Sequence, residues 1–415
     1  MAKFKIRWKM NAHKIVLILI LLASFSFIGC TAKQEQYQTS AEKFSFPWDQ
    51  GEFSDYLLAT KKYISRNRFF LDAQHRKLEI EANSPFELYP DPQTCPISGK
   101  PEKGLLLIHG LSDSPYSMRD LAEEFSKKCF LVRTILLPGH GTRPGDSTAM
   151  TADEWYQVST FALETLKKDV KHVYAGGFST GANISTWLAL KDPSIRGLVL
   201  FSPAFSLKWE YPTSLATLDL FIDWLNKNPI EDYAKYTSFS INSLRQFYIT
   251  SARVQEEITK GNKLKIPVFI ALSGDDSVVD VSYVKNVFQE NLDFPGNRMM
   301  YFTQSQPSPQ QQEDPRIVYR VGNLPDQQIA SISHMAIPNR INNPHYGKNG
   351  DYRSCHMTDS NSDYEPCMQA ERASLWHGAW GSEAEGKIFS RLTFNPYFDE
   401  MVAMSLETIL SPKVN

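Results

Sequence analysis

Several features are scarce in this chain of 415 residues, and each scarcity argues against a class of protein. The charges nearly cancel, with 44 Lys and Arg against 46 Asp and Glu, so there is no basic excess for binding nucleic acid. There is no internal repeat and no heptad run. The one long apolar run, at residues 15–27, is shorter than the roughly 20 residues of a membrane-spanning helix. What remains, with 12% aromatic and 22% charged residues, has the composition of a globular enzyme.

Cysteine is also scarce: there are five, and no two form a Cys-x-x-Cys pair, so a zinc site or other metal site is not expected. Cys30 closely follows the apolar run. The other four favour two disulfides formed in an oxidising compartment, with buried free thiols as the alternative. Three pairings are open, and proximity in sequence favours Cys95 with Cys129 and Cys355 with Cys367.

Residues 1–29 are predicted to form an export signal, because a basic stretch precedes the apolar run. Gly29 stands before Cys30, and a small residue before a cysteine at this place resembles a bacterial lipobox, which implies that Cys30 is lipidated. Thr31 follows, where an aspartate would resemble an inner-membrane retention signal. We therefore expect a lipid-anchored protein of the bacterial envelope, at the outer membrane. An uncleaved anchor and an ordinary secretory signal are the alternatives.

Residues 177–181 read Gly-Phe-Ser-Thr-Gly, between a short apolar run and a helix-like segment at 182–190. In a strand–turn–helix context, small residues around a serine allow a sharp reversal that exposes the hydroxyl and points a helix N-terminus at it. Ser179 is the candidate nucleophile. A Gly/Ser turn without chemistry would also fit these five residues.

Later segments supply the partners that a serine nucleophile needs, first an acid and then a histidine. The apolar run 266–272 ends just before Asp275 and Asp276. His334 follows the apolar segment 329–333, which predicts a histidine fixed at a strand end. The other histidines after the acid lie in a polar insertion and are expected to be loop residues: His345, His356 and His377.

With these segments, with His-Gly-Leu at 109–111 and with Pro-Gly-His-Gly at 138–141, the chain resembles the carboxylesterase and monoacylglycerol lipase branch of the α/β-hydrolase superfamily. The resemblance covers about residues 100 to 340. It implies a triad of Ser179, Asp276 and His334, and no cofactor. Ser-Val-Val-Asp at 277–280 looks like the family's segment after the acid, which favours Asp276 over Asp275.

The resemblance also places the donors for the negative oxygen of the tetrahedral intermediate. Thr180 supplies a backbone N–H at the turn, and Leu111 supplies the other from the upstream loop. His109 and His140 are turn residues, expected to act as structural hydrogen-bonding groups.

Alternating strand and helix patterns predict an α/β fold with a doubly wound, mostly parallel sheet, a cap insertion and a C-terminal insertion. Core strands are expected near 104–108, 130–136, 172–177, 197–202, 266–272 and 326–333, with an edge strand at 76–82. Helices are expected near 54–65, 117–127, 152–169, 182–191 and 281–290. The organisation is a signal peptide at 1–29, a tether and N-terminal edge elements at 30–99, a core at 100–202 and 265–415, and a cap at 203–264.

Residues 31–52 and 304–315 are polar and are expected to be loose. In the cap, a helix is expected near 214–226. Most of its aromatic residues should seat the cap on the core, whereas Trp209 and Trp224 are candidates for an acyl pocket.

The function that these residues favour is hydrolysis of carboxylic esters through an acyl-enzyme, at a membrane reached through the lipid on Cys30. Monoacylglycerols, lysolipids and short-chain esters are the candidate substrates. A serine peptidase of the same fold and a non-catalytic binding or assembly lipoprotein are the alternatives.

Overall fold

The computed structural model describes residues 35–96, 98–208, 222–308, 314–357 and 363–411. Its centre is an eight-stranded sheet in the order β1-β3-β2-β4-β5-β8-β9-β10. The strands are β1 (Glu87–Leu88), β2 (Lys103–Ile108), β3 (Phe130–Ile135), β4 (His172–Phe178), β5 (Ile195–Phe201), β8 (Val268–Ser273), β9 (Arg298–Thr303) and β10 (Ile317–Val321). All neighbours pair in parallel except β1, which is antiparallel to β3 at the edge. The mostly parallel sheet predicted from the sequence is confirmed.

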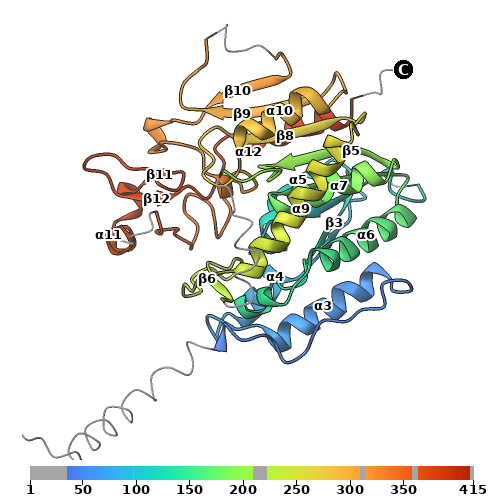
Figure 1. Cartoon of the computed structure of the whole chain (residues 1–415), viewed down its shortest axis with the longest axis horizontal. Helices are drawn as coiled ribbons and strands as arrows, with labels where there is room; N and C mark the ends of the chain where they lie inside the picture. Colours follow the sequence, from blue (N-terminus) through green and yellow to red (C-terminus); the bar gives the residue numbers. More distant parts are fainter. Residues whose placement is uncertain (1–34, 97, 209–221, 309–313, 358–362, 412–415) are drawn as a thin grey trace, which may run out of the picture.

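Helices cover both faces of this sheet (Figure 1). On one face pack α5 (Arg119–Lys127) and α12 (Phe398–Ile409), and on the other pack α6 (Ala152–Asp169), α7 (Thr180–Lys191), α9 (Ile241–Thr259) and α10 (Val281–Asn291). The strands are apolar on both sides for this reason. In β2, Leu105 and Leu107 join the core beneath α5 and α12, whereas Leu106 and Ile108 join the core beneath α6 and α7.

Five of the expected core strands are found, but the sixth, near 326–333, is wrong. That stretch holds the short 3-10 helix η4 (Pro325–Gln327) and then irregular chain. The last two strands of the eight-stranded sheet are β9 and β10, which the sequence pattern did not predict. Both lie toward the edge of the sheet, and their partly exposed side chains weaken the apolar pattern that marks central strands.

The expected edge strand at 76–82 is also wrong, because these residues form helix α4 (Arg76–Asn83). The alternation of Leu78, Ile80 and Ala82 suggested a strand, but the side chains that are buried are Glu79, Ala82 and Asn83, at helical spacing. Leu78 is 42% exposed. A buried ion pair between Glu79 and Arg68 fixes the helix instead.

The described part of the predicted tether, residues 35–52, packs against the core and is not loose. Phe46 contacts Tyr56 of α3 (Phe53–Asn67) and Phe161 of α6. The Ser40 N–H and hydroxyl both donate to the Asp146 carboxylate. Aromatic residues within the polar stretch therefore supply enough buried surface to hold it in place.

Residues 222–264 form a hairpin of β6 (Trp224–Asn226) and β7 (Phe239–Ser240), followed by α9. Helix α9 packs on α7, where the Asn183 amide donates to the hydroxyls of Thr250 and Ser251. The helix expected near 214–226 lies partly outside the described residues, and its end at Trp224–Asn226 is a strand.

The C-terminal insertion carries α11 (Tyr364–Gln369) and a two-stranded sheet of β11 (Trp376–Gly378) and β12 (Phe389–Arg391). Figure 1 shows these elements gathered at one end of the molecule, on the left. Cys355 and Cys367 form one disulfide, and Cys95 and Cys129 form the other. Both expected pairings are confirmed. Across the described ranges, no helix is long and apolar enough to cross a membrane.

Candidate active site

Ser179 occupies a sharp turn between β4 and α7. Its backbone has φ 54° and ψ −115°, a left-handed conformation that a side-chain-bearing residue adopts at a cost. Glycine is required beside it, because a Cβ on Gly181 would lie 2.0 Å from the Ile108 carbonyl oxygen. The first turn of α7 therefore packs directly against the end of β2, and Ser179 lies at the N-terminus of this helix. This is the strand–turn–helix arrangement that the motif predicted.

Asp276 and His334 are in contact. The His334 Nδ1 lies 2.6 Å from an Asp276 carboxylate oxygen, and both residues are buried. The other carboxylate oxygen accepts from the N–H groups of Val278 and Val279, at 2.8 and 3.1 Å. Burial alone would raise the pKa of Asp276, but His334 and these N–H groups hold it below the usual value. Asp276 is therefore an ionised acceptor that fixes the ring of His334.

The neighbouring carboxylates are engaged elsewhere. Asp275 accepts a hydrogen bond from the Gln304 amide at 2.7 Å. Asp280 caps α10 by accepting from the Tyr283 N–H at 3.0 Å. Asp276, rather than Asp275, is the acid that meets His334.

The sequence predicted that His334 ends a strand. In the structure it begins the 3-10 helix η5 (His334–Ala336) instead. Its position is fixed from both sides. The Ser273 hydroxyl, at the end of β8, donates to the Ile332 carbonyl at 2.6 Å, and the Ser333 hydroxyl donates to the Leu392 carbonyl just after β12. The His334 ring lies 4.9 Å from the ring of Phe178, the residue before Ser179. These contacts bring the histidine to the turn that carries the serine.

The loop that contains Leu111 lies beside Ser179. A Cβ on Gly110 would lie 3.3 Å from the Ser179 Cβ and 3.0 Å from the Phe178 ring. Leu111, the next residue, is partly buried, and Thr180 is the first residue of α7. The two residues expected to supply oxyanion donors thus belong to the two backbone segments that adjoin the serine.

His109 and His140 hold this loop. His109 contacts its own loop through Nδ1 and the Gly110 carbonyl, and its Nε2 accepts from the Leu137 N–H at 3.1 Å. The Nε2 of His140 accepts from the Ser112 N–H at 3.0 Å, and its Nδ1 faces the carbonyl of Leu137. Burial lowers the pKa of each histidine to about 3, so both rings are neutral at pH 7 and connect the two loops as hydrogen-bonding groups.

Residues 232–236 lie directly on this loop. The Tyr236 N–H donates to the Ser112 carbonyl at 2.7 Å. The Lys235 ammonium lies 5.7 Å from the centre of the Phe178 ring and 3.8 Å from the buried Asp113 carboxylate. Lys235 and Asp113 are thus close to the candidate site, yet the sequence analysis missed them, because single charged residues in turns carry no pattern.

The other candidate histidines have different partners. His345 is held between Asp232 and Asp351, so it is fixed in a buried cluster rather than carried on a loose loop. His356 faces Glu231 at 3.3 Å, and His377 contacts the Ser390 hydroxyl at 2.9 Å. Of the four histidines after the acid, His334 is the one that contacts Asp276.

Only one of the two acyl-pocket candidates, Trp224, is described by the structure, and its described ring contacts are not with the serine. Trp209 lies outside the described residues. Trp224 packs against the ring of Tyr37, with centroids 5.1 Å apart, and beneath the Lys227 ammonium. Its role in substrate binding stays a prediction.

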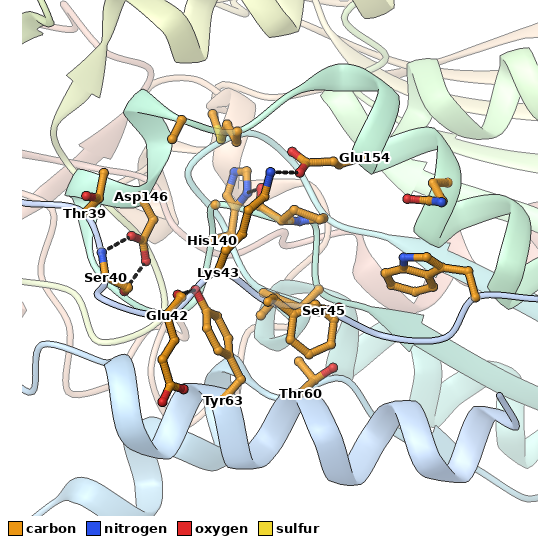
Figure 2. A pocket seen from close by; sticks show the side chains of 18 residues that line it. Thr39, Ser40, Glu42, Lys43, Ser45, Thr60, Tyr63, His140, Asp146 and Glu154 are labelled. Atoms are coloured by element: carbon orange, nitrogen blue, oxygen red, sulfur yellow. Dashed lines mark hydrogen bonds and ion pairs between the residues drawn. The ribbon is translucent and has the colours of Figure 1, made fainter.

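A cavity of about 370 Å³ lies between the N-terminal segment 39–48, α3 and the loop 136–150 (Figure 2). Figure 2 shows Lys43 reaching Glu154 and Ser40 reaching Asp146 on either side of it. His140 lies on its wall, but Ser179, Asp276 and His334 do not line it. In the described part of the chain, no group of three or more His, Cys, Asp or Glu side chains is arranged to hold a metal ion.

Known proteins resemble this chain over its core. A family model described as serine aminopeptidase, S33, matches residues 99–293. The thermostable monoacylglycerol lipase of Bacillus sp. (strain H-257) is 28% identical over 191 residues, which are 45% of this chain and 75% of the lipase. The chain has the α/β-hydrolase fold. These matches, together with the fold, support a hydrolase with monoacylglycerol lipase-like relatives.

Other known proteins resemble this chain more weakly. The uncharacterized protein YnbC of Escherichia coli (strain K12) is 25% identical over 204 residues, 43% of this chain, and the match spans only 34% of that protein. A soluble variant of monoglyceride lipase from Saccharomyces cerevisiae is 14% identical, with a TM-score of 0.42 over 52% of this chain and 81% of its own. The monoacylglycerol lipase of Paleococcus ferrophilus is 19% identical, with a TM-score of 0.41 over 52% of this chain and 87% of its own.

Proposed function

We propose that this chain is a serine hydrolase of carboxylic esters, with Ser179 as nucleophile, His334 as base and Asp276 as the carboxylate that orients the base. The observation that carries the proposal is the 2.6 Å contact between buried Asp276 and His334, next to the strained turn of Ser179. A serine hydroxyl is a weak nucleophile unless a base accepts its proton, and a carboxylate on the far nitrogen orients that base.

The reaction proceeds in two stages. His334 accepts the Ser179 proton as the oxygen attacks the ester carbonyl, and then donates that proton to the leaving alkoxide. Asp276 stabilises the imidazolium that forms in between. The Thr180 and Leu111 N–H groups would stabilise the negative oxygen of the tetrahedral intermediate. Water then attacks the acyl-enzyme by the same route, and no cofactor is needed.

For the substrate we propose monoacylglycerols, lysolipids or short-chain esters, in line with the lipase relative. A panel of p-nitrophenyl esters from acetyl to palmitoyl, followed by monoacylglycerols, would measure the preferred chain length.

We also propose that residues 203–264 cap the site. Support for this comes from the hydrogen bond of the Tyr236 N–H to the Ser112 carbonyl and from the Lys235 ammonium, which lies 5.7 Å from the centre of the Phe178 ring.

A serine peptidase is the second candidate, because the matched family model describes an aminopeptidase. Aminoacyl p-nitroanilides distinguish the two reactions: an esterase hydrolyses the ester panel and leaves the anilides intact. A fluorophosphonate probe tests both against a non-catalytic protein. If wild-type protein does not react with the probe at Ser179, neither enzymatic function holds.

We further propose that the mature protein is anchored to the bacterial envelope, at the outer membrane, through a lipid on Cys30. The motif before Cys30 supports this, because acylation of that cysteine would supply an anchor that the short apolar run does not. Cys30→Ser should abolish metabolic labelling with a tagged fatty acid and release the protein from membranes. Labelling that persists in the variant would overturn the proposal.

A further inference from the structure

A small cavity in the C-terminal insertion is lined by an excess of positive charge. Its volume is about 20 Å³, and it lies between β11, β12 and the chain at 347–354. Four cationic side chains line it, and no Asp or Glu is among the lining residues that the structure describes. These cations are Lys348, Arg353, Arg372 and Arg391. Like charges gathered in one place repel one another, so this arrangement is costly unless a further negative group joins it.

Arg391 is the most informative of the four. Its Nε is buried and has no hydrogen-bond partner among the described residues. An unpaired buried guanidinium nitrogen is rare because it forfeits the hydrogen bonds it would make to water. The carboxylate that acts on Arg391 electrostatically is Asp276, which is already hydrogen-bonded to His334 and to two backbone N–H groups. Among the described residues, Arg391 thus has no counterion that is not already engaged elsewhere.

A second carboxylate near the cavity, that of Asp351, also has partners within the protein. Arg372 donates to the backbone carbonyl of Asp351, and the Asp351 carboxylate, which is bound to His345, also attracts Arg372. Arg353 donates to the carbonyls of Cys367, Met368 and Ala370. These bonds fix the position of Arg353 without neutralising its charge.

The cavity also presents neutral groups that hydrogen-bond to oxygen. The Ser390 hydroxyl and the His377 ring line it and contact each other at 2.9 Å. Burial, together with the charges of Lys348, Arg372 and Arg353, lowers the pKa of His377 to about 4, so at pH 7 the ring is neutral and carries one N–H. A rigid guanidinium, a hydroxyl and a ring nitrogen form a donor set that suits phosphate oxygens.

We propose that this cavity is a binding site for a phosphate group, from free phosphate or from a phosphate monoester headgroup, separate from the hydrolytic site. A volume of about 20 Å³ holds one atom the size of a water oxygen. One phosphate oxygen would therefore enter beside Arg391, and the rest of the anion would lie at the mouth between Lys348 and Arg372, both of which are exposed. Four cations converging on one dianion would give the site its affinity.

Isothermal titration calorimetry tests this with the full-length protein at pH 7 and constant ionic strength. The probes are inorganic phosphate and sn-glycerol 3-phosphate, with chloride as the comparison ion. We expect saturable binding of one phosphate probe per chain and no saturable binding of chloride. Equal affinity for the two phosphates would identify a free-anion site, and tighter binding of glycerol phosphate would identify a headgroup site. The absence of saturable heat with either, or binding of chloride as tightly as phosphate, would overturn the proposal.

Two sets of variants locate the site. The double variant Lys348→Ala/Arg372→Ala removes two exposed charges and should fold normally, yet weaken binding by about tenfold or more. Arg391→Lys keeps the buried charge but loses the planar guanidinium, which can donate two parallel hydrogen bonds, and should also weaken phosphate binding. The matched control, Arg66→Ala/Lys263→Ala, removes two exposed charges elsewhere and should bind as wild type. If the control and the test variants lose affinity equally, the effect comes from net charge and the site is not where we place it.

Discussion

The imidazole of His334 and the carboxylate of Asp276 lie 2.6 Å apart, although 58 positions separate them in the chain. The acid follows β8 and the histidine follows a long irregular segment, yet the Ser273 hydroxyl at the end of β8 binds the Ile332 carbonyl. That bond fixes the chain two residues before the histidine. The pair is therefore positioned by the end of one central strand.

Ser179→Ala should abolish ester hydrolysis and leave the fold intact. The loss should be about a thousandfold or more, because no acyl-enzyme can form. Turnover of p-nitrophenyl butyrate measures it, and circular dichroism checks the fold. Ser194→Ala, at an exposed serine just past α7, is the matched control and should retain full activity. Activity in Ser179→Ala close to that of the control would remove Ser179 as the nucleophile.

His334→Ala should lose activity on the same scale as Ser179→Ala, because the proposed mechanism makes the two residues one catalytic unit. His356→Ala and His377→Ala should retain most activity, since their contacts are with Glu231 and Ser390. The same ester assay compares the three variants. A nearly inactive His377→Ala beside an active His334→Ala would show that the base has been assigned wrongly.

His140→Phe should lower kcat about 10-fold to 100-fold while changing KM little, because the loop that carries the Leu111 N–H loses the acceptor of the Ser112 N–H. Steady-state kinetics give the two parameters separately. His140→Gln has an amide oxygen that can accept the same bond and should recover part of the loss. Equal losses in both variants would indicate a role for ring volume instead of this hydrogen bond.

The stability of the protein should fall as the pH rises from about 6.5 to about 9, because His345 titrates in this range. Burial opposes its charge, but Asp232 and Asp351 raise the pKa of His345 to about 9. A pKa above that of the unfolded chain gives stability that is complete below pH 6.5 and is lost through pH 9. The change should be on the order of 2 to 3 kcal/mol.

Urea unfolding across this pH range measures the effect. His345→Gln should be less stable at pH 6.5 and should show a flatter pH dependence. His75→Gln, at an exposed histidine, should keep the slope of the wild type. If wild type and His345→Gln give parallel curves, the buried pair does not control this pH dependence.

Arg68→Met should cost about 3 to 5 kcal/mol of stability, because it leaves the Glu79 carboxylate buried and unpaired. The exposed fractions of the two side chains are 2% and 1%, and Arg68 also donates to the carbonyls of Gly141 and Tyr233. Lys61→Met breaks an exposed ion pair with Glu81 and should cost at most about 1 kcal/mol. Chemical unfolding of both variants provides the comparison, and equal costs would contradict the argument from burial.

The sequence predicted those parts of the fold that are specified locally. Central strands such as β2 and β8 are buried on both faces and appear as short apolar runs. The turn at Ser179 is specified by the glycines that its backbone requires. The choice of Asp276 followed from the residues after it, and the structure places this carboxylate against His334.

The features that could not be predicted depend on contacts between distant residues. Helix α4 is selected by the pairing of Glu79 with Arg68 and not by its own pattern. Asp232 meets His345 across 113 positions, and nothing in either neighbourhood indicates the pair. The surroundings of His334 depend on Leu392, near the end of the chain, so the sequence predicted a strand end at a residue that begins a 3-10 helix.

The attachment of residues 232–236 has a consequence for catalysis at lipid surfaces. This stretch is bound to the Ser112 carbonyl through Tyr236, to the guanidinium of Arg68 through Tyr233, and to His345 through Asp232. Three separate parts of the chain hold it against the loop that contains Leu111, so it cannot move away without breaking the buried ion pair of Asp232 and His345. Interfacial activation by displacement of this stretch is therefore not expected, and the turnover of dissolved and of micellar esters should join in one continuous saturation curve.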